Sequence, residues 1–140
     1  MPEERQDVGA IDTDVLERIA GRLERSHRFS EVVSQPEYAP DSVVAEYDTG
    51  YFPPGVSRAY LRIRWYDTND FNVHYSEQYE GRSWECRWDR HPNDHNTRGH
   101  VHPPPDAKTP GDDAEFSDDW RDVLARVVGE LDERIEAFWE

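Results

Sequence analysis

Five short runs rich in β-branched and aromatic residues constrain the fold of this chain more than any other feature of its sequence. They cover residues 29–34, 42–47, 58–66, 71–79 and 83–88. Proline, glycine, aspartate and asparagine dominate the short segments between them, and such connections favour antiparallel hairpins. The sequence therefore predicts an antiparallel sheet of about five strands, connected as a meander in which each strand pairs with the next.

Alternating side chains separate the two faces of this sheet. In residues 58–66, apolar residues alternate with tyrosine and arginine, and in residues 71–79 they alternate with asparagine, histidine and glutamine. Successive side chains of a strand point to opposite faces, so one face is predicted to be core and the other to carry Arg62, Arg64 and His74. These three residues suit a substrate-binding surface, and they equally suit an ordinary solvated face.

Two other segments show the apolar spacing of amphipathic helices. One covers residues 13–27, and the other begins at Ser117 or Asp118 and runs to the end of the chain. The predicted fold class is therefore α+β, with the sheet flanked by an N-terminal and a C-terminal helix. A length of 140 residues suits a single domain over 1–140, with a flexible start at 1–12 and a long His- and Pro-rich loop at 89–117.

The charge balance is strongly acidic. Asp and Glu total 31 against 16 Lys and Arg, which gives a formal net charge of -15, and Lys108 is the one lysine. Such excess charge strains a compact state, but at molar salt the Debye length falls to about 3 Å and the repulsion largely disappears. We predict a halophilic protein; an acidic mesophilic protein with a solvated face is the alternative.

Composition also bounds the location and partners of the protein. No stretch approaches the roughly 18 apolar residues of a membrane span, so we expect a cytoplasmic protein with no membrane contact. Net negative charge ordinarily argues against nucleic acid, but a halophile carries it whatever the partner, so local arginine clusters decide. A single cysteine, Cys86, excludes an internal disulfide and a thiolate metal site.

Chemistry-bearing residues concentrate in the segment from Arg87 to Asp106. It contains four of the six histidines, interleaved with arginine and aspartate: His91, His95, His100 and His102. Imidazoles in model peptides titrate at about pH 6.5, so two of them can act as base and acid on a phosphodiester. A nearby arginine can stabilise the charge that develops on the phosphate. The segment therefore predicts a ribonuclease that needs no cofactor.

Two other interpretations fit the same histidines. With an aspartate they supply ligands suited to a divalent transition metal such as zinc, nickel or manganese. Alternatively, the imidazoles are structural and hydrogen-bond a proline-stiffened loop onto the sheet.

The segment resembles the TumE family, small proteins regarded as toxin components of toxin–antitoxin modules. The resemblance rests on an aromatic-rich strand pair that leads into Arg87-Trp88-Asp89, followed by a His- and Pro-rich loop ending in His100-Val101-His102. It covers roughly residues 60–106 and, with the acidic composition, indicates a haloarchaeal-type member. It implies a short α+β toxin that acts on RNA and is neutralised by an antitoxin protein.

Residue chemistry then assigns provisional roles. His91 or His95 pairs with His100 or His102 as acid and base, and Asp89 orients an imidazole. Arg87 binds phosphate, with Arg98, Arg62, Arg64 and His74 as further substrate-binding candidates.

The alternative function is a non-enzymatic protein-binding or metal-binding module whose loop is a docking surface. Three tryptophans exceed what a small core readily buries, namely Trp84, Trp88 and Trp139. They predict exposed aromatic surface and favour a homodimer or another partner contact.

Overall fold

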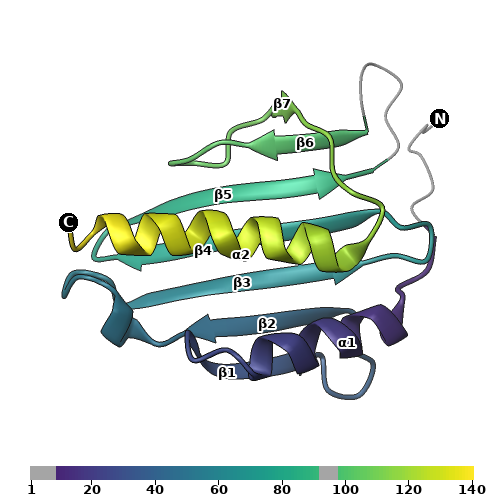
Figure 1. The fold of residues 1–140 in the computed structure, drawn as a ribbon, viewed down its shortest axis with the longest axis horizontal. Coiled ribbons are helices and arrows are strands. Elements are labelled where there is room, and N and C mark those ends of the chain that lie inside the picture. Colours follow the sequence, from purple (N-terminus) through teal and green to yellow (C-terminus); the bar gives the residue numbers. More distant parts are fainter. Residues whose placement is uncertain (1–8, 92–97) are drawn as a thin grey trace.

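The computed structural model describes residues 9–91 and 98–140 and contains two α-helices, a short 3-10 helix and seven strands (Figure 1). Most of the segment predicted to be a flexible start, 1–12, lies outside the described residues, and so does His95. In chain order the elements are α1 (Thr13–Glu24), β1 (Phe29–Gln35), β2 (Ser42–Tyr47), η1 (Thr49–Tyr51), β3 (Arg58–Trp65), β4 (Phe71–Tyr79), β5 (Arg82–Arg90), β6 (Gly99–His102), β7 (Asp112–Asp113) and α2 (Trp120–Ala137).

The strands form one antiparallel sheet in the order β1 to β7, so every strand pairs with its neighbour in the sequence. This confirms the predicted α+β class and the meander. The sheet is larger than the five strands predicted, because β6 and β7 lie within the segment expected to be a loop. They have four and two residues, and strands so short leave no alternating pattern in the sequence.

Both helices pack on the same face of the sheet (Figure 1). Helix α1 begins after Asp12, whose side chain accepts a hydrogen bond from the Val15 N–H, and α2 begins after Asp119, one residue beyond the predicted cap. The apolar stripes of both helices pack on the inward side chains of β2 to β5 to form one core: Leu16, Ile19 and Leu23 of α1, and Val123, Val127, Leu131 and Ile135 of α2.

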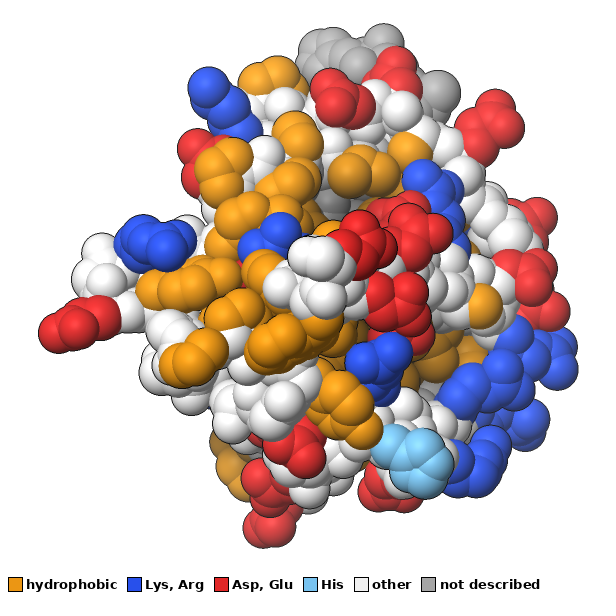
Figure 2. Space-filling view, turned by 60° about the vertical axis from the view of Figure 1, so that its left-hand side comes forward, with side chains coloured by type: hydrophobic (Ala, Val, Ile, Leu, Met, Phe, Trp, Pro, Cys, Tyr) orange, Lys and Arg blue, Asp and Glu red, His pale blue; other side chains and the backbone are white. Residues whose placement is uncertain are grey.

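Two aromatic predictions have different outcomes. Trp88 is buried at 2% exposure and donates an indole hydrogen bond to Glu130, so the prediction of an exposed Trp88 was wrong. Trp139 is 60% exposed, and Figure 2 shows apolar side chains gathered on the side of the molecule that carries the C-terminus. A homodimer through this surface stays a prediction.

Two further properties of the described residues are the burial of Cys86 and the length and polarity of the helices. Cys86 is buried in the core, where loss of solvation raises the pKa of its thiol to about 12. Neither helix is long and apolar enough to cross a bilayer within residues 9–91 and 98–140.

Candidate functional site

The sheet face opposite the two helices, termed here the open face, collects the polar side chains of the central strands. Strand register places them in two rows. Arg62, His74, Arg87 and His102 form the first row across β3 to β6. Arg64, Asn72, Asp89 and His100 form the second. Neighbouring strands lie about 4.8 Å apart, so each row brings residues some forty positions apart in the chain to within about 15 Å.

A buried carboxylate lies at the β5–β6 end of these rows. Asp89 is 3% exposed, and three imidazoles surround it; the Asp89 cluster comprises Asp89, His91, His100 and His102. Its Oδ1 atom lies 3.7 Å from Nε2 of His91 and 3.8 Å from Nδ1 of His100, and its Oδ2 atom lies 3.2 Å from Nε2 of His102. The His91 and His100 rings stack with centroids 5.6 Å apart.

Arg87 and His102 are held in place by several contacts. Arg87 donates through Nε to Asp89 Oδ2 at 3.1 Å, and its Nη2 lies 3.2 Å from His102 Nε2. The other ring nitrogen of His102 lies 3.1 Å from the Lys108 carbonyl oxygen. A carbonyl can only accept, so Nδ1 of His102 carries the proton, and in the neutral ring Nε2 accepts from Arg87. Both nitrogens are thus engaged, which suits an anchoring role for His102.

The Pro-rich segment after β6 explains why His102 is buried. It folds back along β5, where the Glu85 N–H donates to the Pro105 carbonyl at 2.7 Å and the Ala107 N–H donates to the Glu85 carbonyl at 3.1 Å. At Gly111 a Cβ atom would lie 2.8 Å from the Val101 oxygen and 3.0 Å from the His102 ring. The chain therefore passes so close to His102 that only glycine fits at this point.

His91 is the accessible member of the cluster. Its side chain is 43% exposed, against 7% for His100. It borders a pocket of about 410 Å³, termed here the His91 pocket, which is lined by Arg64, Tyr66, Phe71, Asn72, Asp89, Arg90 and His91. The cluster is therefore accessible from the side of β3 and β4.

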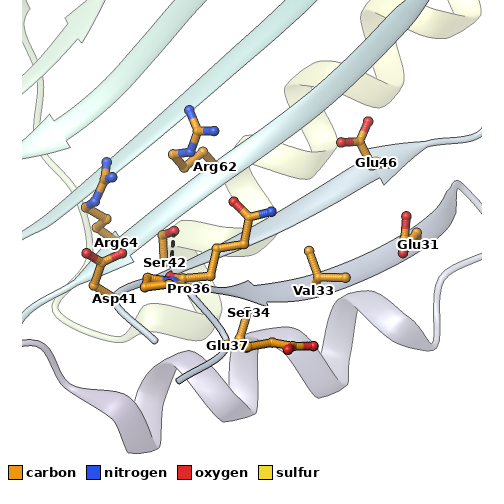
Figure 3. A pocket seen from close by; sticks show the side chains of 11 residues that line it. Glu31, Val33, Ser34, Pro36, Glu37, Asp41, Ser42, Glu46, Arg62 and Arg64 are labelled. Atoms are coloured by element: carbon orange, nitrogen blue, oxygen red, sulfur yellow. Dashed lines mark hydrogen bonds between the residues drawn. The ribbon is translucent and has the colours of Figure 1, made fainter. Parts of the chain in front are cut away.

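A larger hollow of about 760 Å³ lies beside it over β1 to β3, and Figure 3 shows Arg62 and Arg64 projecting into it from β3. Arg64 lines both pockets and so connects them. In the described part of the chain, no carboxylate lies within ion-pair distance of Arg62 or Arg64. The same hollow is also lined by the acidic residues Glu31, Glu37, Asp41 and Glu46.

The structure thus brings together most of the residues singled out in the sequence. Asp89, Arg87 and the three described histidines meet directly, and Arg62, Arg64 and His74 share their sheet face. His74 lies 2.9 Å from Glu85, an ion-pair partner that the sequence analysis did not identify.

One predicted residue lies outside the cluster, and two residues near it were not predicted. Arg98 lies outside the cluster and pairs with the buried Asp70. Sequence reasoning missed Asn72 as a site residue, although the alternation along β4 would have placed it beside Arg64. It also missed Asp113, which lies 3.8 Å from His100 Nε2 through the unanticipated strand β7.

The cluster also has the composition of a metal site. Asp89, His91 and His100 each offer one ligand atom, and the three atoms lie within 4.8 Å of one another. A carboxylate with two imidazoles suits zinc, nickel or manganese.

Comparison with known proteins gives one match. No curated protein and no solved structure matches the chain. The protein family described as Toxin TumE matches residues 16–135, which include all seven strands and most of both helices. The match extends well beyond residues 60–106, which carry the motifs of the resemblance. This chain belongs to the TumE family of toxins.

Proposed function

We propose that this protein is the toxin of a toxin–antitoxin pair and that it cleaves RNA by proton transfer at the Asp89 cluster. The observation that carries the proposal is the position of Asp89, a buried carboxylate facing the rings of both His91 and His100 beside an open pocket. A buried carboxylate beside an imidazole orients the ring, and oriented imidazoles are common general acids and bases.

In the proposed reaction, His91 takes the proton of a ribose 2′-hydroxyl, and the oxygen attacks the adjacent phosphorus. The bond from phosphorus to the 5′-oxygen breaks, and that oxygen receives a proton from His100. The products are a 2′,3′-cyclic phosphate and a 5′-hydroxyl. Arg64 binds the phosphoryl oxygens, because Arg87 is already engaged with Asp89 and His102.

The assignment narrows the roles expected from the sequence. Of the possible acid and base pairs we propose His91 with His100, because both rings face the Oδ1 atom of the buried Asp89. His102 instead lies against Arg87 and the Lys108 carbonyl. His95 stays a prediction, since it lies outside the described residues.

Incubation of the purified protein with total RNA in molar KCl, with and without EDTA, tests the proposal. We expect cleavage that resists EDTA, leaves 2′,3′-cyclic phosphate ends, and is lost in His91→Ala and reduced about a hundredfold or more in Asp89→Asn. His27→Ala, in the turn between α1 and β1, is the matched control and should cleave like wild type. Absence of cleavage by well-folded wild type would refute the proposed ribonuclease activity.

Metal binding is the second candidate, favoured by the ligand atoms of Asp89, His91 and His100. Equilibrium dialysis of untagged protein with Zn²⁺, Ni²⁺ or Mn²⁺ tests it. Stoichiometric binding that is lost in Asp89→Asn, together with EDTA-sensitive cleavage, would assign the imidazoles to a metal. Failure to bind any of these ions would remove this candidate.

We also propose an antitoxin protein as the partner, since the TumE family implies a toxin–antitoxin context. Expression of the chain alone should inhibit growth, and expression of His91→Ala should not. Equal growth inhibition by both would separate toxicity from the Asp89 cluster.

A further inference from the structure

The His91 pocket contains groups that the cleavage reaction does not use. Its volume of about 410 Å³ lies within the range of small-ligand sites, about 300–1,000 Å³. Besides His91, Asp89 and Arg64, which the proposed reaction uses, its lining includes an aromatic ring and a side-chain amide: Tyr66 and Asn72.

Asn72 supplies a side-chain amide in this pocket. It lies on β4 between Arg64 of β3 and Asp89 of β5 in register, and it is only partly exposed. Within residues 9–91 and 98–140, its side-chain amide makes no hydrogen bond. An amide offers both donors and an acceptor, the combination that hydrogen-bonds to the edge of a nucleobase.

Tyr66 supplies an aromatic ring at the same end of the strands. Its backbone is fixed in the β3–β4 turn, where its N–H donates to the Asp70 carbonyl at 2.9 Å and its carbonyl accepts from the Asn69 N–H at 2.8 Å. It also forms a bridge with Ile11. A partly exposed ring on a backbone held by these contacts is a suitable platform for base stacking.

Arg64 completes the set, because it lines the pocket and has no carboxylate partner among the described residues. A stacking ring, a hydrogen-bonding amide and a guanidinium next to His91 match the base, the base edge and the phosphate of one nucleotide. The geometry points to a nucleobase subsite in the His91 pocket, which takes the base of the nucleotide next to the cleaved phosphate.

This inference rests on the proposed ribonuclease activity and names its substrate class. Bases in a duplex are stacked and paired, and a base enters such a pocket only when it is unstacked. The substrate is therefore single-stranded RNA, and the protein selects the base at one position beside the cleavage site.

Two measurements on the full chain test the subsite. The first is equilibrium binding of AMP, GMP, CMP and UMP in molar KCl. The second is sequencing of the RNA ends produced by cleavage, which gives the base distribution at each position. The variants are Asn72→Ala, Tyr66→Leu and Tyr66→Phe, with Gln78→Ala as the control on the same face of β4 outside the pocket.

We expect wild type to prefer a particular base at one position and to bind the corresponding nucleotide most tightly. Asn72→Ala should reduce this preference by about tenfold. Tyr66→Leu should weaken nucleotide binding by about tenfold, while Tyr66→Phe, which keeps the ring, should retain most of that binding. Gln78→Ala should behave like wild type.

The outcomes separate the subsite from the reaction. Cleavage by wild type with an unchanged base distribution in Asn72→Ala and Tyr66→Leu would overturn the subsite and leave the ribonuclease standing. Equal cleavage of fully paired and single-stranded RNA would also overturn it. Nucleotide binding that depends on Tyr66 and Asn72 without any cleavage would support the subsite and overturn the ribonuclease.

Discussion

Arg134 of α2 donates two hydrogen bonds of 2.7 Å to the fully buried carboxylate of Glu77 on β4. The hydroxyls of Tyr75 and Tyr79 donate to the same carboxylate at 2.6 and 2.8 Å. Burial, together with the Glu77 charge, holds the pKa of Tyr75 above its usual range, so its hydroxyl stays protonated and remains a donor. This network joins the C-terminal helix to the centre of the sheet.

Removing one partner of this pair should be costly. Arg134→Met would leave a buried carboxylate without its cation, and we expect the free energy of unfolding to fall by about 3–5 kcal/mol. Denaturant unfolding in molar KCl measures it. Arg18→Met is the control, because Arg18 and its partner Asp14 are largely exposed and their pair contributes about 0.5 kcal/mol or less. Similar losses for both variants would contradict this view of the network.

Gly99 should be indispensable to the β6–β7 end of the sheet. A Cβ atom here would overlap the Ala114 carbonyl oxygen and press on the Phe116 ring, so Gly99→Ala should displace β6 and lower stability by about 1–3 kcal/mol. The measurement is denaturant unfolding beside Gly129→Ala. Gly129 lies within α2 with nothing within 4 Å of its Cβ position, so alanine there should stabilise the protein by about 0.5–1 kcal/mol. A neutral Gly99→Ala would show that β6 can shift freely.

The Glu85 carboxylate should make stability depend on pH in the acid range. Burial acts to raise its pKa, but hydrogen bonds from His74, Ser83 and Ser76 outweigh burial and hold the pKa below its usual range. A depressed folded-state pKa stabilises the fold above the unfolded value of about 4.3, and this contribution is lost as pH falls through the folded-state pKa.

We therefore expect Glu85→Gln to be less stable than wild type at pH 7 and the difference to shrink below about pH 4.3. Thermal unfolding of both proteins across this range measures it, with Glu80→Gln in the exposed β4–β5 turn as the control. A difference that stays constant with pH would mean that the charge of Glu85 contributes nothing.

We propose that the protein is halophilic, and its response to salt tests this. A net charge of -15 on 140 residues should repel itself in dilute buffer, so the unfolding temperature should rise as KCl increases from about 0.1 M to about 1 M and the Debye length falls from about 10 Å to about 3 Å. Sucrose, which does not screen charge, is the control. An unfolding temperature that ignores KCl, or follows sucrose equally, would argue for an acidic mesophilic protein.

Local patterns in the sequence predicted the frame of the molecule. Alternation over residues 58–66 and 71–79 separated the core face from the face of Arg62, Arg64 and His74, and the short connections indicated a meander, because side-chain direction and turn chemistry are local properties. Apolar spacing located both helices, with their ends shifted by a few residues. The histidine cluster was visible because its members are close in the chain.

Tertiary structure decided what the site contains. Strand register placed Asp89 opposite His100 and Arg87 opposite His102, and the returning Pro-rich segment buried His102, so four candidate histidines became one accessible ring and two enclosed rings among the described residues. Strands β6 and β7 formed although their sequences carry no strand pattern, because the edge of β5 offered backbone partners to a chain held against it. Alternation along β4 assigns Asn72 to the open face, but only the pairing of β4 with β5 brings it beside Asp89.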